Sequence, residues 1–257
     1  MGKRSEYAPG TFSWTDLSTP DPDAAKRFYG ELLGWEYEDS PVGDGRVYTM
    51  ISLGGDHVAA LQQLSAPGQP PAWLSYVTVD DADAATDRAT GLGGSAMMEP
   101  FDVMDAGRMA LLADPQGAVF AIWQAKDHPG AGRVNDPGAM SLNQLNTSDV
   151  EGAREFYSGL FGWSFDDHSS EQSSYWAIRN AGSLNGGMMP LEQTGGGAPP
   201  HWFVYFTHAD LDSAAQQIAS SGGHVAAGPM PIEAGMILIA SDPQAAFFGL
   251  FEGEVDP

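Results

Sequence analysis

An internal repeat constrains the fold of this chain more than any other feature of its sequence. The stretch FYGELLGWEYED begins at Phe28, and FYSGLFGWSFDD begins at Phe156, 128 positions later. The similarity extends along the chain in three pairs of segments: 14–35 with 142–163, 73–100 with 202–229, and 111–124 with 238–252. Self-similarity this regular predicts two copies of one structural unit.

The boundaries of the two units follow from the composition between them. The stretch AKDHPGAGRVNDPGA has no apolar period and is rich in glycine and proline, as linkers are. We therefore expect a first module at residues 10–125, a linker at 126–138 and a second module at 139–254.

Each copy carries the signature of a helix with one apolar face. Apolar residues recur with the helical period in both copies: Ala25, Phe28, Tyr29 and Leu32, then Ala153, Phe156, Tyr157 and Leu160. Asp21 stands before a proline and suits an N-cap, whereas Ser148 and Glu151 are expected to form a capping box. Gly34 and Gly162 suit the left-handed position that ends a helix. The Phe-Tyr pair is thus predicted to be core rather than a cofactor site.

Strand-like stretches fill most of the remaining sequence. In the first copy they lie at 12–19, 46–53, 58–63 and 74–79, with two more on either side of the turn DPQG at 114–117. A second helix is expected at about 81–92, ended by two glycines. Each copy therefore reads as two β-α-β-β-type halves, which places the chain in the α+β class with helices covering curved sheets.

Composition excludes several classes of function. The net charge of −23 repels phosphate backbones and anionic lipid, so we expect no nucleic-acid or membrane partner. The absence of cysteine excludes disulfides, thiolate metal sites and cysteine nucleophiles. No apolar run is long enough for a transmembrane helix, and the first residues lack the apolar stretch of a secretory signal, so a cytoplasmic protein is expected.

The order of these motifs resembles a known family. A strand, a helix with FYGELLGW, further strands, a helix that begins VDDAD, and then ADPQGAVFAI together resemble the glyoxalase/bleomycin resistance/extradiol dioxygenase superfamily, the vicinal oxygen chelate fold, over residues 10–253. The opening KRSEYAPGTFSWTDLST resembles two-module actinobacterial proteins labelled glyoxalase-like or hydroxylase. The resemblance implies tandem modules, each of paired βαβββ units whose curved mixed sheets surround a cavity. Members of this family include lyases, isomerases, dioxygenases, transferases and metal-free drug-sequestering proteins, so the resemblance does not determine the function.

The resemblance also implies where a metal would bind. Metal-using members place His or Gln early in the first strand, His in the strand before the second helix, and Glu seven residues after the Asp of the DP turn. In this chain these positions hold apolar residues: Trp14 and Leu142, Leu74 and Phe203, Ala121 and Gly249. A shift of one residue is possible only at Leu74 and Phe203. We therefore expect no metal and no other cofactor.

Aromatic and polar residues are expected on the inner faces of the sheets. The candidate ligand-binding residues are Trp14, Tyr76, Gln144, Phe203, Tyr205 and, more weakly, His57, with Phe12, Leu74 and Leu142 beside them. Such a set suits a pocket for an organic ligand, although strand aromatics also serve as ordinary core. The candidate catalytic residues are Asp16, whose pKa should rise among aromatic rings, and His201 at the start of its strand. Each residue also has a purely structural interpretation: Asp16 as an exposed acid at the end of a strand, and His201 as a histidine hydrogen-bonded to a neighbouring loop.

Two functions from different classes follow. The first is a metal-independent protein that binds a hydrophobic or aromatic small molecule in a cleft of the curved sheets, in a sequestration or resistance role. The second is an enzyme of the same superfamily, a lyase, isomerase or hydroxylase/dioxygenase, with Asp16 or His201 as acid or base. A scaffold with filled cavities is a third reading. A monomer is expected from the tandem modules, with a homodimer as the alternative.

Overall fold

The computed structural model describes residues 2–43, 45–66, 68–171, 173–195 and 197–253. In the first half of the chain the strands are β1 (Phe12–Thr19), β2 (Glu36–Pro41), β3 (Val47–Leu53), β4 (Asp56–Gln63), β5 (Ala72–Thr78), β6 (Ser95–Val103), β7 (Gly107–Ala113) and β8 (Val119–Ala125). In the second half they are β9 (Met140–Thr147), β10 (Ser164–Asp167), β11 (Trp176–Asn180), β12 (Ser183–Pro190), β13 (His201–Thr207), β14 (His224–Ile232), β15 (Gly235–Ser241) and β16 (Phe247–Gly253). The helices are α1 (Pro22–Leu33), α2 (Ala82–Gly91), α3 (Val150–Phe161) and α4 (Leu211–Ser220), with a short 3-10 helix at Leu191–Thr194.

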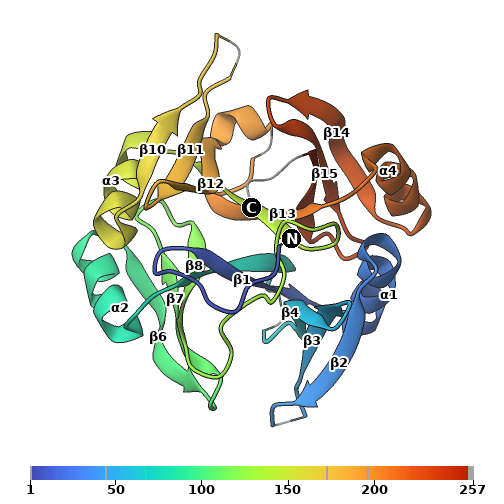
Figure 1. Cartoon of the computed structure of the whole chain (residues 1–257), viewed down its shortest axis with the longest axis horizontal. Coiled ribbons are helices and arrows are strands. Elements are labelled where there is room, and N and C mark those ends of the chain that lie inside the picture. The colour runs from blue at the N-terminus through green and yellow to red at the C-terminus, as the bar shows by residue number, and fades with distance from the viewer. Residues whose placement is uncertain (1, 44, 67, 172, 196, 254–257) are drawn as a thin grey trace.

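The strands form two curved mixed sheets with the same topology (Figure 1). The first sheet has the order β2-β3-β4-β1-β5-β8-β7-β6, and the second has the order β10-β11-β12-β9-β13-β16-β15-β14. In the first sheet, β1 is parallel to β4 and antiparallel to β5, and β5 is parallel to β8. Each sheet is therefore two βαβββ units joined at their first strands, which confirms the predicted α+β architecture of tandem modules.

The helix ends follow local chemistry with one exception. The Asp21 side chain accepts a hydrogen bond of 3.0 Å from the Ala24 amide and caps α1, while Gly34 (φ 73°) and Gly162 (φ 74°) end their helices in the left-handed region. The predicted capping box in the second copy is wrong. Asp149 caps α3 instead, because the helix begins one residue later and the Asp149 carboxylate accepts from the Gly152 amide at 3.0 Å.

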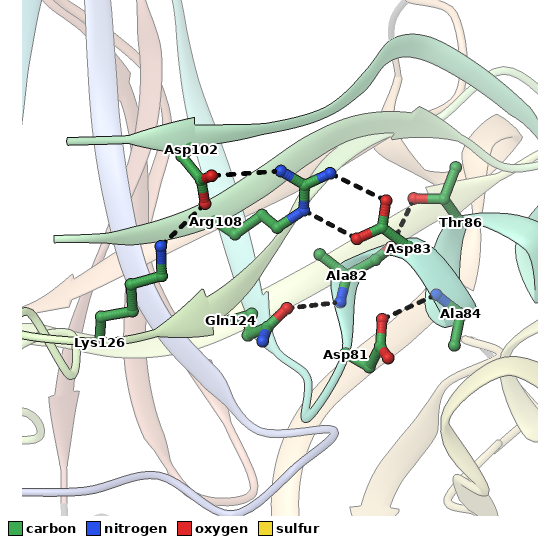
Figure 2. Close-up of polar contacts among 9 residues, drawn as sticks. All are labelled: Asp81, Ala82, Asp83, Ala84, Thr86, Asp102, Arg108, Gln124 and Lys126. Atoms are coloured by element: carbon green, nitrogen blue, oxygen red, sulfur yellow. Dashed lines mark hydrogen bonds and ion pairs between the residues drawn. The ribbon is translucent and has the colours of Figure 1, made fainter. Parts of the chain in front are cut away.

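The N-terminus of α2 is fixed to the neighbouring strands by polar contacts (Figure 2). The Gln124 side chain accepts a hydrogen bond of 3.0 Å from the first amide of the helix, and Arg108 forms two bonds of 2.8 Å with Asp83. Asp102 on β6 binds Lys126 at 2.9 Å and lies 3.6 Å from Arg108. These cations hold the pKa of both aspartates below the usual value. The contacts tie α2 to the β6–β8 half of the first sheet.

The two modules pack through reciprocal tyrosine–aspartate contacts. The Tyr29 hydroxyl, on α1, donates to Asp242 in the turn before β16 at 3.2 Å and accepts from the Trp73 indole at 3.1 Å. The reciprocal contact has the same arrangement. The Tyr157 hydroxyl, on α3, donates to Asp114 of the first module at 3.1 Å and accepts from the Trp202 indole at 2.9 Å. The predicted helix aromatics are thus core residues, and the two tyrosines form part of the contact between modules.

Candidate functional site

The face of the first sheet turned away from the second module is lined with aromatic residues around one acid. We call this concave face the first cup. Asp16 lies on β1 at its centre and is 1 % exposed. One carboxyl oxygen, Oδ2, accepts hydrogen bonds from the Tyr76 hydroxyl at 2.7 Å and the Tyr48 hydroxyl at 3.5 Å. The Trp14 indole N–H donates in turn to the Tyr48 hydroxyl at 3.3 Å. The other oxygen, Oδ1, is buried and has no hydrogen-bond partner in the described part of the chain.

Burial is the main influence on the pKa of the Asp16 carboxyl. Loss of solvent raises the pKa of Asp16 from 3.8 to about 6, and the hydrogen bonds from Tyr76 and Tyr48 lower it by less than burial raises it. A carboxyl with a pKa near 6 exchanges its proton readily at neutral pH. The first cup can therefore offer either a buried anion or a buried acid to a molecule that reaches it.

The linker closes the first cup at the end where Trp14 lies. The ring of His128 stands edge-on against Trp14, with 4.5 Å between centroids, and lies 6.3 Å from the His57 ring. The Trp123 indole donates to the His128 backbone carbonyl at 2.9 Å. Burial lowers the pKa of His128 to about 4, and its Nε2 has no partner among the described residues. Sequence reasoning placed His128 in an irregular linker, where no periodicity could indicate this contact.

The linker backbone continues across the first sheet beyond His128. The Ala131 amide donates to the Ser13 carbonyl at 2.7 Å, and the Gly132 amide donates to the His57 carbonyl at 2.7 Å. Arg133 then pairs with Asp56 at 2.6 Å. The linker thus runs from β8 past β1 to β4 as a strap that covers one end of the first cup.

The corresponding face of the second sheet, the second cup, has a different polar centre. The Gln144 amide donates to Asn146 Oδ1 at 2.8 Å. Asn146 Nδ2 lies 3.0 Å from His201 Nε2, and His201 Nδ1 lies 2.8 Å from the Pro199 carbonyl. A carbonyl only accepts, so His201 carries its proton on Nδ1 and accepts at Nε2. Both ring nitrogens of His201 are hydrogen-bonded within the chain.

Aromatic rings also line the second cup. The rings of Phe203 and Tyr205 lie 5.1 Å apart. A Cβ atom added at Gly249 would overlap the Tyr205 ring, and one added at Gly187 would overlap the Tyr175 hydroxyl. The two glycines therefore leave the space that the two tyrosines occupy.

The predicted site residues divide between the two cups. Trp14, Asp16 and Tyr76 come together in the first, with His57 exposed near its rim. The second contains Gln144, His201, Phe203 and Tyr205. The two candidate catalytic residues are thus not in one site. Tyr48, His128, Asn146 and Tyr175 belong to the cups and were not predicted.

One expected inner-face residue lies on the opposite side of its sheet. A β-bulge between Phe12 and Trp14 shifts the alternation of β1. Phe12 therefore packs against the second module, with ring centroids 4.9 Å from Trp202 and 5.5 Å from Trp163. The expectation that Phe12 and Trp14 share a face was wrong for this reason.

The residues present do not fit the metal site that the fold family implies. Leu74 pairs with Asp16 and Ala121 pairs with Tyr76, so both face the first cup without offering a ligand atom. At Gly249, the place of the family glutamate in the second module, the Tyr205 ring occupies the space for a side chain. Within the ranges that the structure describes, no three His, Asp or Glu side chains gather closely enough to hold an ion.

A pocket of about 120 Å³ lies outside both cups. It is enclosed by the N-terminal segment, the linker and strands β9 and β12, and its lining includes Arg4, Tyr7, Phe12, Asn143, Leu184 and Asn185. Asn143 is already bonded to the Ser75 hydroxyl at 2.6 Å. The pocket therefore lies on the side of the second sheet that meets the first module. Among the described residues, no helix has the length and apolarity needed to cross a bilayer.

Comparisons with known proteins agree over nearly the whole chain. The family model of the Glyoxalase/Bleomycin resistance protein/Dioxygenase superfamily matches residues 11–122 and 139–248. A Mycobacterium tuberculosis protein named "Putative glyoxylase CFP32" is 42 % identical over 258 residues and covers 98 % of both chains. The anthracycline biosynthesis protein DnrV of Streptomyces peucetius is 34 % identical over 266 residues, which is 96 % of this chain and 95 % of that one.

Solved structures share the fold at low sequence identity. The Mn(II)-bound glyoxalase from Novosphingobium aromaticivorans has a TM-score of 0.67 at 17 % identity, covering 100 % of this chain and 85 % of that one. The 2,3-dioxygenase LapB from Pseudomonas sp. KL28 has a TM-score of 0.68 at 13 % identity, covering 98 % of this chain and 95 % of that one.

Proposed function

The chain belongs to the Glyoxalase/Bleomycin resistance protein/Dioxygenase superfamily, and we propose that it is a metal-independent member that binds a hydrophobic or aromatic small molecule. The binding site is the first cup, and the role is sequestration or resistance. The single observation that carries this proposal is the unpartnered Asp16 oxygen, buried in a cup of aromatic rings. A buried polar atom without a partner is rare in folded proteins, and a ligand group that bonds it removes the cost.

The chemistry of the cup supports an organic ligand rather than a metal complex. Trp14 and Tyr76 provide flat rings with polar edges, which stack on planar molecules and still form hydrogen bonds. The residues at the family's metal positions supply no carboxylate or imidazole. Two relatives carry the name anthracycline biosynthesis protein, and anthracyclines are flat polycyclic compounds of the class such a cup accepts.

Entry of a ligand requires a movement at the strap. Asp16, Trp14 and Tyr76 are each 5 % exposed or less with the His128 ring in place. The His128 side chain has no hydrogen bond from Nε2 to lose when it turns away from Trp14. We therefore propose that a rotation of this side chain away from Trp14 admits the ligand at this end of the cup.

Acid–base catalysis in the same cup is the second candidate. The observation that favours it is the pKa of Asp16, which burial raises to about 6, close to the value that suits a general base at neutral pH. A relative named as a glyoxylase is consistent with such an activity. In this reading Asp16 takes a proton from a carbon or hydroxyl of the bound molecule, and Tyr76 steadies the carboxyl.

A fluorescence titration tests the binding proposal. Neutral planar aromatics such as 1-naphthalenemethanol are added to the purified chain, and tryptophan emission is followed. Saturable quenching is expected, and it should be lost from Trp14→Phe but kept in Trp176→Phe, whose tryptophan lies on β11 of the other sheet. Quenching that persists in Trp14→Phe would place the ligand elsewhere.

Metal content is measured on the same preparation. Plasma mass spectrometry after soaking in zinc, manganese, iron and nickel should find far less than one metal per chain. Retention of about one equivalent would overturn metal independence and direct the assays toward glyoxalase and dioxygenase activities.

A further inference from the structure

We infer that the first cup selects an aromatic molecule that carries a protonated amine, and that the ammonium group lies against Asp16. This inference rests on the proposed function and adds the charge of the ligand to it. Its basis is the pattern of partners around the carboxyl, the rings that surround it and the contrast with the second cup.

The Asp16 carboxyl is satisfied on one side only. The hydroxyls of Tyr76 and Tyr48 both donate to Oδ2, so Oδ1 is left as an acceptor without a donor. No lysine, arginine or histidine side chain pairs with this carboxyl anywhere in the described ranges. A buried carboxylate without a cation is costly, and an N–H donor that carries a positive charge compensates it best.

The rings around Asp16 suit a cation as well as a flat molecule. Trp14, Tyr48 and Tyr76 are linked to one another or to the carboxyl by hydrogen bonds, which fixes their positions around the acid. Aromatic faces attract ammonium groups, and the attraction strengthens when water is excluded. The net charge of −23 further raises the local concentration of cations near the molecule.

The second cup provides an internal contrast. Gln144 stands 128 positions after Asp16, at the same place in the repeat. Its amide is neutral and already donates to Asn146 at 2.8 Å and to the Met189 sulfur at 3.0 Å. Tyr205 and Tyr175 repeat the tyrosine pair of the first cup, but without an acid between them. We therefore expect one amine site in each chain rather than two.

Three probes with one ring system separate charge from shape. Isothermal titration calorimetry at pH 7.5 compares 1-naphthylmethylamine, neutral 1-naphthalenemethanol and anionic 1-naphthoate. The amine is expected to bind with one site per chain and at least about ten-fold more tightly than the alcohol, the factor typical of a hydrogen bond to a charged group. The naphthoate is expected to bind most weakly.

Matched variants assign the preference to the carboxyl. In Asp16→Asn the ratio between amine and alcohol should fall to within about two-fold, because the amide keeps the shape and removes the charge. Asp87→Asn, at an exposed position of α2, removes the same charge from the surface and should leave the ratio unchanged. Circular dichroism confirms that both variants fold.

The possible outcomes distinguish this inference from the proposed function. Equal binding of amine and alcohol would keep aromatic binding and overturn the selection for an amine. An amine preference that persists in Asp16→Asn, or that falls equally in Asp87→Asn, would overturn the role of this carboxyl. Failure of all three probes to bind would overturn both proposals.

Discussion

Replacing Asp16 by asparagine should change how the stability of the protein depends on pH. The folded carboxyl has a pKa of about 6, against 3.8 when it is exposed. The folded chain therefore binds more protons than the unfolded chain between these values. Stability from this group is present at low pH and is lost as pH rises from about 4 through 6. The asparagine variant has no such loss.

The magnitude follows from linkage between protonation and folding. A difference of about two pKa units, each worth 1.36 kcal/mol, makes ionised Asp16 cost about 3 kcal/mol at pH 7.5. At pH 5 the folded acid is still mostly protonated, and the same relation gives a cost of about 1.6 kcal/mol. The stability of Asp16→Asn relative to the unchanged protein should thus grow by about 1.4 kcal/mol between pH 5 and pH 7.5.

Urea unfolding followed by circular dichroism measures this growth. Any constant offset, such as the different hydrogen bonding of the amide, cancels between the two pH values. The His128 ring titrates in the opposite sense but is present in both proteins, so its effect cancels as well. A stability difference that stays constant from pH 5 to pH 7.5 would show that Asp16 is not held in a desolvated site, and the reasoning would fail.

Three further changes test other parts of the structure. His128→Gln should gain stability relative to the unchanged protein as pH falls from 7.5 to 5, measured by urea unfolding. Burial lowers the pKa of folded His128 to about 4, so protonation over this range favours the unfolded chain; a stability difference that does not change with pH would contradict this. Gly249→Ala should lower the free energy of unfolding by about 1–3 kcal/mol, because the new methyl group overlaps the Tyr205 ring; an unchanged midpoint would refute the overlap. Tyr157→Phe should lower the free energy of unfolding by about 1–3 kcal/mol in calorimetry, because Asp114 Oδ2 loses its hydroxyl donor and the Trp202 indole loses its acceptor; an unchanged value would contradict this cost.

The repeated elements of the fold could be predicted because they follow short-range rules. Apolar residues at the helical period, each time followed by a glycine, identify α1 and α3 from sequence alone, and both glycines adopt the positive φ that this position favours. The strands β2 and β6 were not predicted. Both lie at the edges of the first sheet and are largely exposed, so their sequences lack the apolar alternation that marks a half-buried strand.

The candidate site could be predicted only where it depends on strand alternation. Trp14, Asp16 and Tyr76 share a face because β1 and β5 alternate regularly from Trp14 onward. The contact between Asp16 and Tyr48 depends on the register of β3 against β4 and of β4 against β1, which the sequence does not specify. The position of His128 depends on the path of the strap across the sheet. Long-range pairing, rather than local propensity, places these two residues.

Because the linker joins the two modules in one chain, the residues of the two cups can change independently. If identical single modules paired as a symmetric dimer, every substitution would appear in both cups at once. Covalent joining of two copies removes that symmetry requirement while the reciprocal contacts of Tyr29 and Tyr157 keep the pairing geometry. One copy can then keep an acid at position 16 while the other carries an amide at position 144. Duplication thus lets one half of the molecule specialise while the other half preserves the shared scaffold.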